Sequence, residues 1–264
     1  MNDIFNLKRF LLLFKKVIAE RPTQTVGVTA LLLLLSFILY AGAKMVAGFG
    51  TAQNLTLIWG IAGGGFFLSS FMFGYFNTNA GGCSYLTLPA SFFEKWLCAI
   101  LIAGILYPII FLSFYHLVDV AFVTAYHNGL DRSSIFYRQQ LESVYSFDLN
   151  GMIAWKVYAL FLQLTGVMLV GSLYFNKIPL IKTGLAVCLL FFIIYGLNWL
   201  IAASLFQNVN DAGPYDHVNI QVGKEAGTLI LPAALENTFH IAIAFVIPVI
   251  LWFLPLARLK EKEF

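Results

Sequence analysis

The chain has 264 residues, of which 60% are of hydrophobic types and 11% are charged. A soluble domain usually carries about 25% charged residues, and a water-soluble fold of this length could not bury so much apolar surface. The net charge of +3 is too small for a nucleic-acid binder, which shows a basic face or stripe. The composition therefore indicates an all-α integral membrane protein, because lipid accepts apolar side chains without a buried core.

Residues 1–22 predict an amphipathic helix that lies at the membrane interface. Between residues 4 and 21, Lys8, Lys15 and Lys16 share one side of a helical wheel, while Phe10 and Leu13 lie on the other. Such a helix can turn its basic side toward anionic headgroups, so membrane lipids are expected contacts. Arg21-Pro22 ends it, because the residue before a proline avoids the helical region.

Six apolar stretches follow within residues 23–264, a six-helix transmembrane domain. Each has roughly 18–24 residues with almost no charge, which suits a hydrocarbon layer of about 30 Å at 1.5 Å per residue. The predicted spans are Val26–Ala43, Leu55–Phe76, Trp96–Val118, Val157–Phe175, Thr183–Phe206 and Thr238–Ala257.

The lysines and arginines predict the orientation, since they are enriched in cytoplasmic flanks. With the N-terminus inside, eleven of the 16 basic residues are cytoplasmic, and the five outside are Lys44, Arg132, Arg138, Lys156 and Lys224. We therefore expect both termini in the cytoplasm and two long outside loops, residues 119–156 and 207–237. In the first loop, residues 133–141 have helical character. In the second loop, apolar and polar residues alternate over residues 218–222, and residues 228–231 can form a returning strand after a turn. This is a weak signal for a β-hairpin.

The cytoplasmic loop between the second and third spans, residues 78–95, is the most informative stretch. Ser91 and Glu94 form a capping box, in which each side chain bonds the backbone N–H of the other residue. Pro89 stops the preceding segment from running into this helix. We expect a short element over residues 82–88 that lies across the cytoplasmic surface. The alternative is only a well-capped entry to the third span.

The string Leu-Pro-Ala-Ser-x-x-Glu-Lys-Trp-Leu, residues 88–97, follows a glycine-rich second span and resembles membrane subunits of ABC-2-type transporters, particularly those of Bacteroidota. The likeness extends to the basic N-terminal helix and the six spans. In that family this loop holds a coupling helix that rests on a separate ATPase subunit. The resemblance implies that the ATPase-coupling residues are Ser84, Tyr85, Leu88, Pro89, Ser91, Glu94 and Lys95.

The same resemblance implies an inner-membrane permease, present as a homodimer or a heterodimer of permease subunits. The sequence contains no phosphate-binding Gly-x-x-x-x-Gly-Lys-Ser/Thr string, so any ATP hydrolysis belongs to the partner. We expect no catalytic residue, no cofactor and no metal in this chain. Cys83, Cys98 and Cys188 have no regular spacing and give neither a disulfide framework nor a zinc pattern.

Gly60 and Gly64 lie four residues apart on one face of the second span, which lets another helix approach closely. That helix belongs either to this chain or to a dimer partner. Pro108, Pro248 and Pro255 each remove a backbone donor within a span and can kink it.

Three functions compete. The first is the permease of an ABC-type exporter, whose apolar span interiors favour an amphipathic or lipid-like cargo. The second is a non-transporting scaffold whose outside loops dock an envelope partner. The third is an intramembrane enzyme, which would need His116, Asp119 and His240 to face one cavity.

Overall fold

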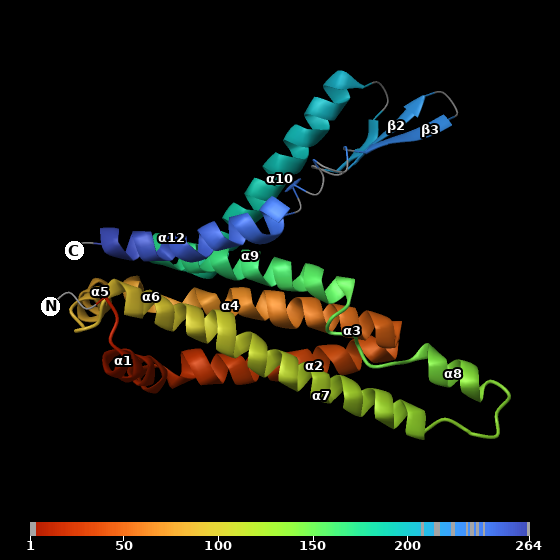
Figure 1. Ribbon diagram of the computed structural model, residues 1–264, viewed down its shortest axis with the longest axis horizontal. Coiled ribbons are helices and arrows are strands. Elements are labelled where there is room, and N and C mark those ends of the chain that lie inside the picture. Colours follow the sequence, from red (N-terminus) through yellow and green to blue (C-terminus); the bar gives the residue numbers. More distant parts are fainter. Residues whose placement is uncertain are drawn as a thin grey trace.

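The computed structural model describes residues 4–206, 209–213, 217–222, 225–230, 232, 235, 238–239 and 241–262 (Figure 1). In this part of the chain six helices are long and apolar enough to cross a membrane, which confirms the predicted number. All but the fifth pack together as a bundle, with both chain termini at one end (Figure 1). We call this the terminal end and the opposite one the far end.

The helices begin with α1 (Leu7–Glu20), which confirms a helix in the N-terminal segment. The first two spans are η1 (Thr23–Gly27) with α2 (Val28–Ala47), and α3 (Phe49–Leu57) with η2 (Ile58–Gly63) and α4 (Gly64–Met72). Then come η3 (Gly74–Asn77), α5 (Asn79–Leu86), and the third span, α6 (Phe92–Ile100) with η4 (Leu101–Leu106) and α7 (Tyr107–Asn128). The rest are α8 (Tyr137–Ser143), α9 (Met152–Tyr174), α10 (Pro179–Leu205), and η5 (Ala242–Val246) with α12 (Ile247–Glu261).

The third span differs from its prediction at the far end. The helix continues through Asp119 to Asn128, so residues 119–128 do not belong to the connecting loop. The prediction ended at Val118 because an aspartate seldom extends an apolar span. Asp119 is fully buried and hydrogen-bonded, and this environment lets the helix run on.

Four spans contain a π-helical turn, in which the backbone is wider than in an α-helix. Two of these turns end two residues before a proline, η4 before Pro108 and η5 before Pro248. A proline cannot donate a backbone hydrogen bond and crowds the preceding turn. The π turns therefore lie where the expected helix distortion occurs.

The bundle is held by aromatic rings that lie against glycines on neighbouring helices. Phe111 and Tyr107 of α7 lie where side chains of Gly60 and Gly64 would be, and the Tyr107 hydroxyl donates to the Gly60 carbonyl. Trp252 of α12 similarly lies against Gly104 and Gly166. Small residues of this kind let helices approach closely in lipid.

The fifth span is different, since α10 diverges from the bundle and leads to a small sheet (Figure 1). Only Thr183 and Ala202 are buried among its described residues. The sheet has the order β1-β2-β3, with β1 (Val209–Ala212), β2 (His217–Val222) and β3 (Glu225–Ile230) all antiparallel. The β2–β3 pair confirms the predicted hairpin.

Replacing Gly60 by alanine is expected to destabilise the bundle, because the added Cβ would collide with the Phe111 ring. Overpacking of this kind costs roughly 1–3 kcal/mol. Thermal unfolding in detergent should show a lower melting temperature. Gly196→Ala in α10 is the matched control, since no atom lies within 4 Å of its added Cβ. Equal melting temperatures for the two variants would contradict this packing.

Candidate functional site

The terminal end of the bundle gathers α1, η3, α5 and the start of α6 in one place (Figure 1). We call this assembly, with the connecting residues 87–91, the terminal junction. It contains all seven predicted coupling residues and two buried charges, Glu94 and Lys95. Buried charges in a chain with so few charged residues need specific partners.

Glu94 is fully buried and joins α1 to α6. The Arg9 guanidinium donates to both of its carboxylate oxygens, with Nε 2.8 Å from Oε2 and Nη2 2.8 Å from Oε1. The backbone N–H groups of Asn6 and Ser91 donate to the same carboxylate at 2.8 and 2.9 Å. Such a charge-assisted, two-pronged contact fixes both distance and direction.

Ser91 completes the predicted capping box and also contacts the chain before α1. Its hydroxyl oxygen accepts from the Glu94 backbone N–H at 3.1 Å, as the sequence predicts. The same hydroxyl donates to the Ile4 carbonyl at 2.6 Å, so it also holds the chain that leads into α1. The capping box is therefore part of a contact between segments about 90 residues apart.

Lys95 is buried beside Glu94 but points to α5. Its Nζ donates to the carbonyl oxygens of Leu86 and Leu88, at 3.0 and 3.5 Å. It also lies 5.5 Å from the centroids of the Tyr85 and Phe92 rings. A cation at the C-terminal end of a helix satisfies carbonyls that have no partner within that helix. Lys95 thus ties the end of α5 to the first turn of α6.

Stacked aromatic rings join α5 to the end of the second span. Tyr75 of η3 stacks on Tyr85 with the centroids 4.5 Å apart, and the Arg21 guanidinium lies 3.8 Å from the Tyr75 centroid. Burial and the nearby Glu20 carboxylate raise the pKa of Tyr75 to about 12. Its hydroxyl accordingly stays protonated and donates to Glu20 at 3.3 Å.

The predicted coupling residues divide into two groups. Ser84 and Pro89 are exposed, and Leu88 and Ser91 are half-buried. Tyr85, Glu94 and Lys95 are buried and hold the junction together from inside. Sequence reasoning did not find Arg9 and Asn6 as partners of Glu94. The sequence shows both an arginine in the N-terminal helix and a glutamate at the start of the third span, but no local pattern links residues so far apart in the chain.

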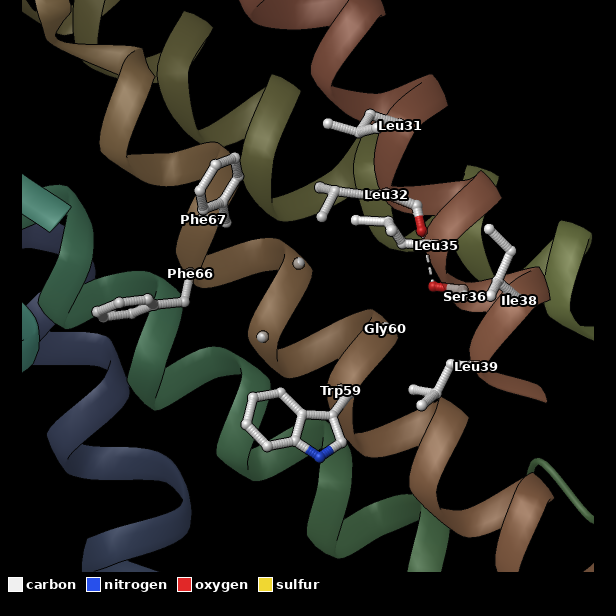
Figure 2. Close-up of a pocket in the computed structure, with 12 residues that line it drawn as sticks. Leu31, Leu32, Leu35, Ser36, Ile38, Leu39, Trp59, Gly60, Phe66 and Phe67 are labelled. Carbon is white, nitrogen blue, oxygen red and sulfur yellow. Dashed lines mark hydrogen bonds between the residues drawn. The ribbon is translucent and has the colours of Figure 1, made fainter. Parts of the chain in front are cut away.

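Gly60 and Gly64 have their open sides filled by rings of this same chain, as described above. Their backbone also borders an apolar groove of about 650 Å³ between α2 and the second span. Figure 2 shows Leu31, Leu32 and Leu35 of α2 pointing across this groove toward the helix that carries Gly60. Ser36, a polar residue on its wall, donates to the Leu32 carbonyl at 2.8 Å.

The proposed His116, Asp119 and His240 cluster is not assembled in the part of the chain that can be described. His116 is exposed, whereas Asp119 is buried and accepts from Tyr40, Gln53 and Phe147. His240 lies outside the described residues. Within those residues no three His, Cys, Asp or Glu side chains are grouped as a metal ion would require.

Comparison with known proteins identifies no relative, because no family model, no curated protein and no solved structure matches the chain. The terminal junction is therefore interpreted from its own geometry.

Removing the Arg9 charge is expected to destabilise the junction, since it leaves a buried carboxylate without a cation. Arg9→Gln should reduce stability by about 1–3 kcal/mol, less than for a fully buried ion pair, because the Arg9 side chain is 35% exposed and Glu94 keeps two backbone donors. The measurement is thermal or denaturant unfolding of the purified chain, with exposed Lys8→Gln as the control. Adding Glu94→Gln to Arg9→Gln should recover part of the loss, and an additive further loss would contradict the pairing.

Lys95→Met should loosen α5 without releasing α1. The substitution keeps the apolar stem but removes the donor to Leu86 and Leu88. Amide hydrogen exchange should become faster in a peptide that covers residues 82–90 and stay unchanged in one that covers α1. Unchanged exchange over residues 82–90 would show that Lys95 does not anchor this element.

Proposed function

We propose that the chain is the permease subunit of an ABC-type exporter, with α5 as the element that a separate cytoplasmic ATPase subunit contacts. The observation that carries the proposal is the two-sided character of α5. Its exposed side includes Asn79, Ala80, Cys83 and Ser84, while Gly82 and Tyr85 are buried on the junction. The resemblance of residues 88–97 to ABC-2 membrane subunits supports it.

The inner side of α5 suits a mechanical role. Tyr85 stacks on Tyr75 of η3, the short helix after the second span, and Lys95 near the start of the third span donates to the last carbonyl of α5. A force applied to the exposed side would therefore reach two spans at once. Buried, fully paired polar groups resist local deformation, so the short helix would move with these spans rather than unfold.

We also propose that α1 lies in the cytoplasmic membrane interface. Leu7 and Leu11 are exposed on one side of α1, and Phe10, Leu13 and Val17 are buried against the junction. The exposed leucines with the neighbouring Lys8 and Lys15 suit the boundary between acyl chains and anionic headgroups. With the basic flanks inside, both termini are cytoplasmic and the membrane is the bacterial inner membrane.

Two permease subunits, identical or related, would form the transport path, as in the family that the sequence resembles. The apolar groove of Figure 2 suits a hydrocarbon chain, which supports an amphipathic cargo. A scaffold without transport is the second candidate. It is favoured by the far-end segment around α8, where Ile135 and Phe136 are 97% and 62% exposed and available to an envelope partner.

The test is purification of the chain from its native membrane, followed by a search of the purified complex for an ATPase subunit and by co-expression of that subunit with the chain. Ala80→Glu with Ser84→Glu places two carboxylates on the exposed side of α5, four residues apart. If the ATPase covers this side, their desolvation should weaken binding at least about tenfold, which corresponds to about 1.4 kcal/mol. Because both residues are exposed, the melting temperature should not change.

Gln139→Glu with Ser143→Glu in α8 is the matched control, since these residues are also exposed and four apart. The permease proposal expects normal ATPase binding in this variant. Absence of any ATPase from the complex would refute the proposal. Loss of an envelope partner only in the α8 variant would favour the scaffold.

A further inference from the structure

The far end of the bundle contains a second buried carboxylate, Asp119, whose partners come from three other segments. Tyr40 of α2 donates its hydroxyl at 2.6 Å, and Gln53 of α3 donates its amide at 2.9 Å, both to Oδ1. The backbone N–H of Phe147 donates to Oδ2 at 2.7 Å. Asp119 itself is fully buried.

All three partners donate to the Asp119 side chain, and none of them carries a charge. The basic residue Lys44, one turn beyond Tyr40 on α2, lies instead over the Phe49 and Phe122 rings, 4.7 and 4.8 Å from their centroids. Asp119 is therefore held by hydrogen bonds from neutral groups. A buried carboxylate with so many converging donors orders the segments that supply them.

One of these segments is irregular. Residues 144–149, which we call the strap, contain no helix or strand and lead into α9. The strap crosses the bundle inside the far ends of the helices. Tyr40, on the same carboxylate as the strap, lies seven residues before the end of α2, and Asp119 lies nine residues before the end of α7. At 1.5 Å per residue these offsets are about 10 and 14 Å.

Side chains, not a regular ladder, hold the strap backbone. Besides the Asp119 contact, Gln53 donates to the Tyr145 carbonyl at 2.9 Å, and Tyr158 donates to the Leu149 carbonyl at 3.0 Å. The His127 ring lies 2.8 Å from the Val144 carbonyl oxygen. Phe147 meets the Tyr115 ring edge-on at 6.0 Å. Irregular backbone is tolerated at this depth only when protein groups satisfy it.

We infer that the strap is a movable closure across α2, α3 and α7 near their far ends, and that Asp119 is its latch. The carboxylate accepts hydrogen bonds from α2, α3 and the strap, and the Tyr115 side chain one turn before it contacts the same three segments. An asparagine at this position would keep one acceptor oxygen and direct an NH₂ group at a donor. The strap would then lose its tie to the carboxylate and be held only by its remaining side-chain contacts, while the helices, packed through glycines and rings, stay in place. The inference concerns the chain alone and does not rest on the proposed function.

Asp119→Asn tests the latch, with the full chain in lipid nanodiscs and no ATPase present. Amide hydrogen exchange of a peptide that covers residues 144–149 should become at least about tenfold faster, the effect of losing about 1.4 kcal/mol of local stability. Peptides from α4 and α9 should be unchanged. Asp148→Asn is the matched control, because Asp148 is an exposed strap residue that does not contact Asp119.

A second experiment measures movement of the strap away from the helices, separately from local loss of its hydrogen bonds. With the three native cysteines replaced, spin labels at Ser146→Cys and Thr51→Cys, both exposed positions, report the distance between strap and α3. Asp119→Asn should give a longer and broader distance distribution, and an unchanged one would overturn the closure. If Asp119→Asn unfolds the chain, Phe147→Pro decides, since it removes the strap's own donor to Asp119 and keeps the carboxylate. Exchange of the other strap amides equal to native in Phe147→Pro would then refute the latch.

Discussion

Lipid removes the main force that assembles soluble proteins, because an apolar side chain gains little by moving from acyl chains to a helix interface. Close packing and satisfied polar groups must hold the helices instead. The bundle meets this constraint with rings that lie against glycines, such as Phe111 on Gly60 and Trp252 on Gly104. The Trp252 indole also donates to the Leu162 carbonyl at 2.7 Å, so one side chain supplies both kinds of contact.

The polar part of this solution is concentrated on one long helix, from Phe92 to Asn128. Glu94 near its first residue fixes α1, and Asp119 near its other end fixes the strap. Each carboxylate is fully buried and collects donors from segments far away in the sequence. The third span therefore positions the irregular chain at both ends of the bundle. The π turn before Pro108 lies between the two carboxylates and divides this helix into two parts.

The two ends differ in a way that bears on function. At the terminal junction Glu94 and Lys95 are buried and one face of α5 is left exposed. At the far end the buried Asp119 side chain accepts from the strap backbone. The two proposals, a partner contact at one end and a closure at the other, concern separate parts of the chain and can be tested independently.

Local patterns predicted much of the fold. Run lengths and hydropathy determined six spans, alternation indicated the β2–β3 hairpin, and Ser91 with Glu94 predicted a helix start. Each of these features depends on residues within one turn, one hairpin or one span. The predicted end of the third span was wrong because it, too, was based on local residues alone. Locally Asp119 is a charge that stops an apolar helix, and its partners Tyr40 and Phe147 lie 79 and 28 residues away.

The sequence by itself determined a six-span membrane chain with a capped start to its third span and a short element before it. Only the tertiary structure decided that Glu94 and Lys95 face inward, that Arg9 is the counter-ion, and that Asp119 holds a strap. The physical reason is that composition and spacing fix which segments must lie in lipid. The choice of donor for a buried carboxylate depends on how helices meet, and contacts between distant segments leave no mark in either segment alone.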